Sequence, residues 1–452
     1  MAHGDRRSRP NSYYAHDRRA IICPTNRLLS IGMPGADPSY HSRLIEPVLA
    51  ELAAELSALM IVGPRAVGKT TTAERHAATT IRLDVPAEAA AFAADPDAAL
   101  RGLEEPVLLD EWQAVPDVLG AVARSVNADP RPGRFVLTGS VRAEIESTPW
   151  PGTGRLQRAA MFPMTVREQR SPLGSQSFLD KLVAGTPLAA PAEAVDLRSY
   201  VELALSGGFP QPALALSGAR ARASWFDSYI NDLLTHDIEQ VEEPRTKRRD
   251  PVRLRRYFEA YALNSAGVFD HKTIYDAARV RKETGDAYEE LLTRLFVIEQ
   301  VPAWTSNRLK RLVLSPKRYL VDPALLAHLL RLDAGGIVRD GDLLGRVLDT
   351  FVAAQLRPEL AVSIERPHAH HLRTKGGERE IDLLLELGGF RVVGIEVKAS
   401  AAPRDDAAKH LAWLRDALGD RFLAGVVLHT GPRVYPLGER IVAAPISTLW
   451  TD

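Results

Sequence analysis

The residues best suited to chemistry lie between positions 59 and 71, where an apolar run leads into a loop bounded by two glycines. The loop has the spacing G-x-x-x-x-G-K-[ST] and comprises Gly63, Pro64, Arg65, Ala66, Val67, Gly68, Lys69, Thr70 and Thr71. In such a loop, backbone N–H groups and the N-terminus of the following helix surround a phosphate group. Lys69 would contact the β- and γ-phosphates, and Thr70 would ligate Mg²⁺. The pattern therefore predicts nucleotide binding.

Two acids extend this candidate site. Asp110 and Glu111 follow the apolar run 106–109, and at the carboxyl end of a parallel strand they would arrive beside the loop. Asp110 is suited to hold Mg²⁺, usually through water, and Glu111 is suited to polarise an attacking water. Acids at such a position also cap helices, but nucleotide binding alone does not need Glu111. After a phosphate-binding loop, the pair predicts hydrolysis.

A third apolar run, 134–137, ends at two hydroxyl residues, Thr138 and Ser140. They could sense the γ-phosphate or orient the attacking water, and the other interpretation is a local turn. ATP is preferred to GTP because nothing resembles the guanine-specifying signature Asn/Thr-Lys-x-Asp. The expected cofactors are therefore ATP and Mg²⁺.

A second constellation lies in the last quarter of the chain. Alternation predicts strands at 379–386 and 392–398, which carry Asp382 and then Glu396 and Lys398. This is the D…E-x-K arrangement of restriction-endonuclease-like folds, in which two carboxylates bind Mg²⁺ and the lysine positions or activates water. Asp349, in a predicted helix at 343–356, would be an additional acid. Because fold analogy does not establish activity, cleavage and an inert domain both stay open.

Three histidines precede these strands, at His368, His370 and His371. A metal cluster is one interpretation. In an extended segment, however, neighbouring residues point to opposite faces, so a polar loop is favoured.

The overall composition limits the environment of the protein. Lys+Arg and Asp+Glu both number 57 among 452 residues, so no whole-protein field favours nucleic acid or a membrane. The single cysteine, Cys23, excludes an internal disulfide and a cysteine-based zinc cluster. Because no apolar run approaches the length of a membrane span, we expect a cytoplasmic protein without membrane contact.

Several segments resemble a bacterial group of AAA-type ATPases that carry a C-terminal domain of unknown function. They are the phosphate-binding loop 63–71, Leu109-Asp110-Glu111-Trp112-Gln113, Leu137-Thr138-Gly139-Ser140, and 154–168 with Gly154-Arg155, Phe162-Pro163-Met164 and Glu168. The resemblance continues through Gly207-Gly208-Phe209-Pro210, Pro316-Lys317 and Tyr319 to Asp322, and through the D…E-x-K segment. It implies an additional strand in the sheet, a sensor at Thr138 or Ser140, and Gln113 following the acids.

The chain also departs from this group. Ala66 stands where glutamine is usual, and Trp112 stands where a smaller aliphatic residue is usual. Arg155, or failing that Arg158 or Arg142, could act as an arginine finger that stabilises transition-state charge. A surface or salt-bridged arginine is the equally open interpretation.

We therefore expect an α/β protein with a P-loop AAA-type parallel sheet, followed by three further modules. The expected boundaries are an N-terminal, partly disordered tail at 1–41, a P-loop ATPase domain at 42–165, a helical connector at 166–248, a winged-helix-like module at 249–335, and a restriction-endonuclease-like domain at 336–452. The winged-helix-like module is predicted from helices at 269–278 and 286–294 and a strand pair at 296–304 and 310–321.

Nucleic acid, a protein partner and a second copy of the chain all stay open as partners. Basic residues between Arg245 and Arg256 could contact phosphates, although the acids just before them make a solvated helix face equally compatible. The second helix of the winged-helix-like module would present Glu289 and Glu290. These acids argue against use of that helix in a DNA major groove, and they favour a structural or protein-contact role.

Overall fold

The computed structural model describes residues 1, 40–140, 154, 156–170, 173, 176–237, 250–305 and 314–451. The predicted tail up to residue 39, Arg142, Arg155 and the basic residues 245–249 lie outside the described residues. The described residues from Tyr40 onward all belong to one unit of the fold.

The first sheet has five strands in the order β2-β3-β4-β1-β5, and all neighbouring strands are parallel. The strands are β1 (Ala58–Val62), β2 (Thr79–Arg82), β3 (Val107–Asp110), β4 (Phe135–Gly139) and β5 (Leu156–Ala160). Every residue of β1, β3 and β4 is buried, which is why these strands are nearly continuous apolar runs in the sequence. β4, which carries Thr138, lies between β1 and β3 in this order.

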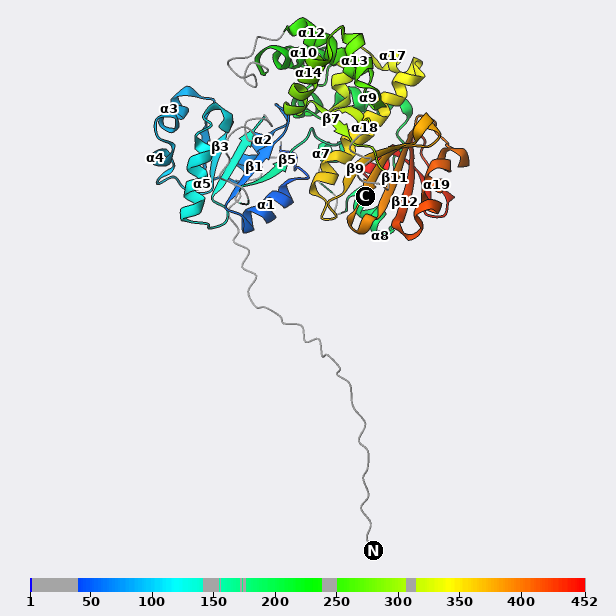
Figure 1. Cartoon of the computed structure of the whole chain (residues 1–452), viewed down its shortest axis with the longest axis horizontal. Helices are drawn as coiled ribbons and strands as arrows, with labels where there is room; N and C mark the ends of the chain where they lie inside the picture. The colour runs from blue at the N-terminus through cyan, green and yellow to red at the C-terminus, as the bar shows by residue number, and fades with distance from the viewer. Residues whose placement is uncertain are drawn as a thin grey trace. The chain divides into compact units, whose positions relative to one another are not determined.

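One helix precedes β1, and further helices lie between the successive strands from β1 to β4 (Figure 1). They are α1 (Glu46–Glu55), α2 (Lys69–Glu74), α3 (Pro86–Ala94), α4 (Pro96–Leu100) and α5 (Val118–Ala128). The alanine-rich segment between β2 and β3 forms two helices, α3 and α4, rather than one. Asp95 is extended at φ −154° and its side chain caps α4, while Pro96 disfavours helical geometry in the residue before it.

A helical region follows the first sheet. It contains α7 (Val166–Gln169), α8 (Phe178–Ala184), α9 (Leu197–Ser206), α10 (Ala219–Asp232) and two π-helical turns, η2 (Gln211–Ala215) and η3 (Leu233–Asp237). Phe209, in the Gly-Gly-Phe-Pro turn, is fully buried. Its ring packs against Trp225, Phe226 and Tyr229 at centroid distances of 5.4, 6.0 and 4.8 Å.

The next module contains the two helices and the strand pair on which the winged-helix-like prediction rests. Its elements are α12 (Pro251–Leu263), β6 (Gly267–Val268), α13 (His271–Ala278), α14 (Lys282–Arg294), β7 (Ile298–Val301) and β8 (Lys317–Leu320), followed by α16 (Pro323–Leu329) and α17 (Ala334–Arg339). β8 is the central strand of its three-stranded sheet. The expectation that α14 presents Glu289 at its surface is wrong, because Glu289 is buried and its carboxylate pairs with Arg318 at 3.0 Å.

The last domain is built on a six-stranded mixed sheet in the order β13-β14-β12-β11-β10-β9. Its elements are α18 (Gly341–Val362), β9 (His368–Arg373), β10 (Glu380–Glu386), β11 (Val392–Lys398), α19 (Lys409–Leu418), β12 (Phe422–His429), β13 (Tyr435–Gly438) and β14 (Ile441–Pro445). Leu383 and Leu385 share a core with α18, and Leu384 shares another with α19. The two helices therefore cover opposite faces of β10.

The polar loop expected around His370 and His371 is wrong, since both residues lie buried in β9. Burial lowers the pKa of His371 to about 4, and its Nε2 lies 3.1 Å from the carbonyl oxygen of Ser315. His371 is therefore a neutral residue of the protein interior.

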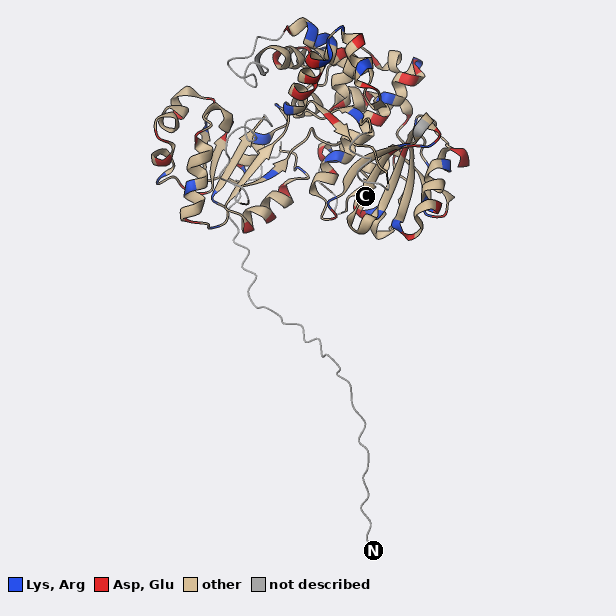
Figure 2. Cartoon of the chain, viewed as in Figure 1, with Lys and Arg blue, Asp and Glu red and all other residues tan. Residues whose placement is uncertain are grey.

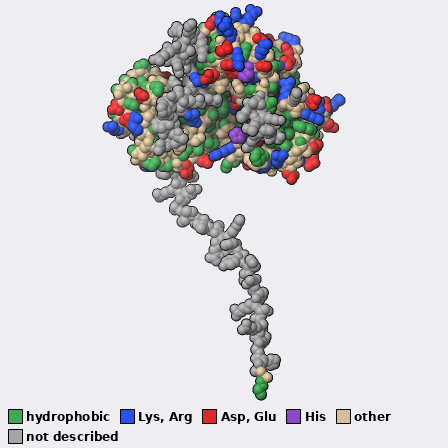
Figure 3. All heavy atoms as spheres, in the orientation of Figure 1, with side chains coloured by type: hydrophobic (Ala, Val, Ile, Leu, Met, Phe, Trp, Pro, Cys, Tyr) green, Lys and Arg blue, Asp and Glu red, His purple; other side chains and the backbone are tan. Residues whose placement is uncertain are grey.

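Charges of both signs are interspersed along the ribbon and on the visible face (Figures 2 and 3). This distribution agrees with the zero formal net charge. Among the described helices, none is long and apolar enough to cross a lipid bilayer.

The turn at Gly208 provides a test of packing. A Cβ atom on Gly208 would lie 2.3 Å from the carbonyl oxygen of Met164, so Gly208→Ala must displace the backbone. We expect a loss of about 1–3 kcal/mol of stability, measured by thermal or urea unfolding. The control is Gly218→Ala, whose Cβ would meet nothing within 4 Å and should change stability by less than about 0.5 kcal/mol. Equal stability of the two variants would contradict the close approach.

Candidate functional site

The phosphate-binding loop between β1 and α2 requires glycine at both ends. Gly68 has φ +92°, which L side chains rarely adopt, and a Cβ on Gly63 would lie 2.0 Å from the carbonyl oxygen of Met161. Ala66 also has a positive φ, at +62°. The glycines of the sequence pattern therefore stand where the backbone excludes other residues.

Lys69 begins α2, and its side chain turns back into the loop. The ammonium group donates to the carbonyl oxygens of Gly63 at 3.2 Å and Pro64 at 2.8 Å. Lys69 is buried, so its charge is held at the place where this type of loop receives phosphate oxygens. The residues present therefore fit a nucleotide phosphate.

Asp110 links three elements at the carboxyl edge of the sheet. Its Oδ1 accepts hydrogen bonds from Thr70 Oγ1 at 2.8 Å and from Thr138 Oγ1 at 2.5 Å. Burial raises the pKa of Asp110, and the bonds from Thr138 and Thr70 act in the opposite direction. A hydroxyl and a carboxylate are oxygen ligands of the kind that Mg²⁺ prefers, so Thr70 and Asp110 fit the predicted metal role.

Glu111 follows β3 with φ +52° and is positioned by two neighbours. Its carboxylate accepts hydrogen bonds from Ser140 Oγ at 3.1 Å and from Gln113 Nε2. Its backbone N–H donates to Thr138 Oγ1 at 3.0 Å. A carboxylate held in this way can accept a proton from an attacking water.

Thr138 and Ser140 therefore occupy different positions, although both were predicted as sensors or water-orienting groups. Thr138 is fully buried, and its hydroxyl joins Asp110 to the backbone of Glu111. Ser140 contacts the Glu111 carboxylate directly. The structure brings together Lys69, Thr70, Asp110, Glu111, Thr138 and Ser140 on one edge of the sheet, and Arg155 lies outside the described residues.

Arg43 was missed by sequence reasoning. Its guanidinium donates to Val67 O and Phe162 O, each at 2.7 Å, and to Glu168 Oε1 at 3.0 Å. Arg43 thus stabilises the phosphate-binding loop through its hydrogen bond to Val67 O. No local pattern marks it, because its partners lie up to 125 positions away.

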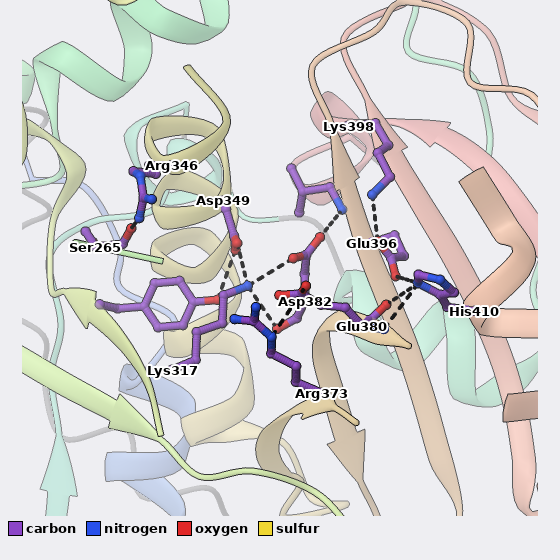
Figure 4. Close-up of polar contacts among 12 residues, drawn as sticks. Ser265, Lys317, Arg346, Asp349, Arg373, Glu380, Asp382, Glu396, Lys398 and His410 are labelled. Atoms are coloured by element: carbon purple, nitrogen blue, oxygen red, sulfur yellow. Dashed lines mark hydrogen bonds and ion pairs between the residues drawn. The ribbon is translucent and has the colours of Figure 1, made fainter. Parts of the chain in front are cut away.

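The D…E-x-K residues separate into two groups (Figure 4). Asp382 and Asp349 both contact Lys317, whose Nζ lies 3.0 Å from Asp382 Oδ1 and 2.5 Å from Asp349 Oδ2. Glu396 instead pairs with Lys398 at 2.7 Å. The interpretation of these residues as one metal site therefore needs correction, because an unpredicted lysine lies between two of the acids.

Burial raises the pKa of one carboxyl in each group, and the charge of Asp382 acts on Glu396 in the other group. Burial, and next the charge of Asp382, raise the pKa of Glu396 to about 8. Burial raises the pKa of Asp349 to about 6, against the opposing charge of Lys317. Within the described part of the chain, no group of three or more His, Cys, Asp or Glu side chains is arranged to hold a metal ion.

Three segments of the chain match known protein families. Residues 56–169 match an AAA domain, residues 197–335 match a domain of unknown function (DUF8612), and residues 344–449 match another (DUF4143). Uncharacterized proteins of Mycobacterium bovis and Mycobacterium tuberculosis are each 28% identical over 399 residues, which is 87% of this chain and 81% of the relative.

Among solved structures, a Walker-type ATPase of Pyrococcus abyssi is similar at a TM-score of 0.41 and 15% identity, covering 64% of this chain and 96% of the other. The AAA match contains the phosphate-binding loop and the acids at the end of β3, and the DUF4143 match contains Asp349, Asp382, Glu396 and Lys398. The chain thus contains a P-loop domain that matches an AAA domain and a C-terminal region that matches DUF4143.

Proposed function

We propose that the AAA domain binds ATP with Mg²⁺ and hydrolyses it, and that its nucleotide state is transmitted to the C-terminal domain. The observation that carries hydrolysis is the hydroxyl of Thr138, which joins Asp110 to the backbone of Glu111. This contact fixes the metal-side acid and the candidate base relative to each other. A site for binding alone would not require that relation.

The residues of the site have separable roles in this proposal. Lys69 exchanges its two loop carbonyls for phosphate oxygens, and Thr70 and Asp110 hold the Mg²⁺. Bound Mg²⁺ supplies charge neutralisation at the β- and γ-phosphates. Glu111 takes the proton of the attacking water, with its carboxylate oriented by Ser140 and Gln113.

Removal of the candidate base is the first test of hydrolysis. Glu111→Gln should lower the rate of phosphate release on the order of a hundredfold or more, because the amide cannot accept the proton. Nucleotide affinity, measured by equilibrium binding, should be retained since Lys69 and Thr70 are intact. Glu104→Gln is the control, because Glu104 is exposed. This variant should hydrolyse ATP at the wild-type rate. Unchanged turnover in Glu111→Gln would exclude Glu111 as the base.

Thr138 tests whether the two acids are positioned together. Thr138→Val keeps the side-chain shape but removes the hydroxyl, so kcat should fall about tenfold or more through misplacement of both acids. KM for ATP should change little, because the buried Thr138 makes its hydrogen bonds to protein groups. Thr138→Ser should restore most of kcat. Equal loss in the Val and Ser variants would indicate a packing role instead.

A continuous set of contacts leads from the phosphate-binding loop to α18. Arg43 joins Val67 to Glu168 in α7. From α7, the backbone N–H of Val166 donates to Gln355 Oε1 at 2.7 Å. Arg167 of α7 also pairs with Glu359 at 3.3 Å. Because Gln355 and Glu359 both lie in α18, this helix is the element through which we expect the C-terminal domain to respond.

Hydrogen exchange tests this transmission. In Glu111→Gln, which should retain ATP, amide exchange in α7 and in residues 352–362 should be at least about threefold slower with ATP than with ADP. Gln355→Ala removes the acceptor of Val166 N–H and should reduce the difference. α19, on the other face of β10, serves as the internal reference. Identical exchange with ATP, with ADP and without nucleotide would contradict the transmission.

Two roles for the C-terminal domain correspond to the two interpretations of its motif. One is nucleotide-controlled contact with nucleic acid or its cleavage, and the other is a protein-interaction switch with an inert domain. The ion pairs of Lys317 with Asp349 and Asp382 favour the second. Incubation with DNA and RNA in the presence of ATP and Mg²⁺ or Mn²⁺ separates them, since Asp382→Ala must abolish any cleavage that belongs to this domain.

A further inference from the structure

The cluster around Lys317 brings three elements into contact. Lys317 begins β8, Asp349 lies in α18 and Asp382 lies in β10. The ammonium lies between the two carboxylates, and it also lies 3.3 Å from the carbonyl oxygen of Asp382 (Figure 4). A cation is therefore already present between two of the acids of the predicted metal site.

All four carboxylate oxygens of the two aspartates have partners. Asp349 Oδ1 accepts from the Tyr319 hydroxyl at 2.9 Å, and Oδ2 accepts from Lys317. Asp382 Oδ1 accepts from Lys317, and Oδ2 accepts from the backbone N–H of Val397 at 2.9 Å. A divalent ion such as Mg²⁺, which requires close oxygen ligands, would have to displace these donors.

Lys317 cannot withdraw without disturbing its strand. Its residue is 2% exposed, and its backbone pairs with Val268 on one side and Val301 on the other. Tyr319 lies two residues further along β8, on the same face of the strand, and binds the same Asp349. The ammonium is thus held in place by the central strand of a sheet.

The second lysine makes its ion pair with Glu396, although the charges of Asp382 and Asp349 also act on it. Lys398 pairs with Glu396 Oε2, whereas Glu396 Oε1 is buried without a hydrogen-bond partner among the described residues. A wild-type metal centre would join Asp382 to Glu396. Instead, Asp382 pairs with Lys317 and Glu396 pairs with Lys398.

We propose that Lys317 is the resident cation of the Asp349–Asp382 cluster, and that it excludes divalent metal ions from the D…E-x-K residues. In the wild-type protein, these residues form an ionic contact between β8, α18 and β10. Removal of the Lys317 ammonium turns the cluster into a divalent-cation site. This inference goes beyond ATP hydrolysis and does not depend on it.

The test is Mn²⁺ binding to the full chain without nucleotide, followed by electron paramagnetic resonance. Any Mn²⁺ bound near Thr70 and Asp110 is common to every variant. Lys317→Met should gain one Mn²⁺ per chain relative to wild type, and Lys317→Met combined with Asp382→Asn should lose it again. Lys398→Met is the matched control, because it removes the motif lysine that does not contact Asp349 or Asp382, and it should gain none.

A folded Lys317→Met protein without additional Mn²⁺ would overturn the proposal. Because this variant leaves two buried carboxylates without their cation, its folding must be checked by thermal unfolding and size-exclusion chromatography. Should it fail to fold, the comparison of wild type with Glu396→Gln decides. A metal centre in the wild type would lose Mn²⁺ in Glu396→Gln, whereas equal Mn²⁺ in the two proteins supports exclusion by Lys317.

Discussion

The shape of the nucleotide site depends on the buried carboxylate of Glu168. This side chain accepts hydrogen bonds from Arg43 Nε at 3.0 Å, from the backbone N–H of Leu44 at 2.9 Å and from that of Thr165 at 2.7 Å. Truncation of one member of such a buried pair typically costs about 3–5 kcal/mol, because the other charge is left uncompensated. Arg43 also donates from Nη1 to Val67 O and from Nη2 to Phe162 O. One ion pair therefore holds the phosphate-binding loop against α7.

Buried ion pairs also join the module that contains β8 to the C-terminal domain. Lys317 and Arg318 are neighbours in β8, so their side chains leave opposite faces of the strand. Lys317 binds acids of α18 and β10, whereas Arg318 binds Glu289 of α14 at 3.0 Å and the carbonyl oxygen of Phe269 at 2.9 Å. Both cations are almost completely buried. One short strand is thus fixed on both faces by charge.

Local patterns in the sequence were sufficient to predict where the phosphate-binding loop lies and which strands carry Asp382 and Glu396. They also predicted that Asp110 and Glu111 lie at the end of a strand. Each of these predictions depends on spacing within one or two elements. Arg43 and Lys317 could not be assigned roles in this way, since their partners are brought near only by the folded chain. The loop expected at His370 and His371 failed for the related reason that pairing with β10 overrides local polarity. In this protein, the position of a polar residue can be predicted from the sequence when its partners lie nearby in the chain.

α18 contacts both α7 and Lys317, so it limits how a change at the nucleotide site can affect the C-terminal domain. Gln355, which contacts α7, lies six residues from Asp349, or about 9 Å along the helix. Allosteric coupling is typically about 1–3 kcal/mol, whereas breaking a buried ion pair costs about 3–5 kcal/mol. A bias of that size applied at Gln355 is too small to separate Asp349 from Lys317. We therefore expect α18 to carry β8 with it, so that the winged-helix-like module and the C-terminal sheet respond to nucleotide as one body.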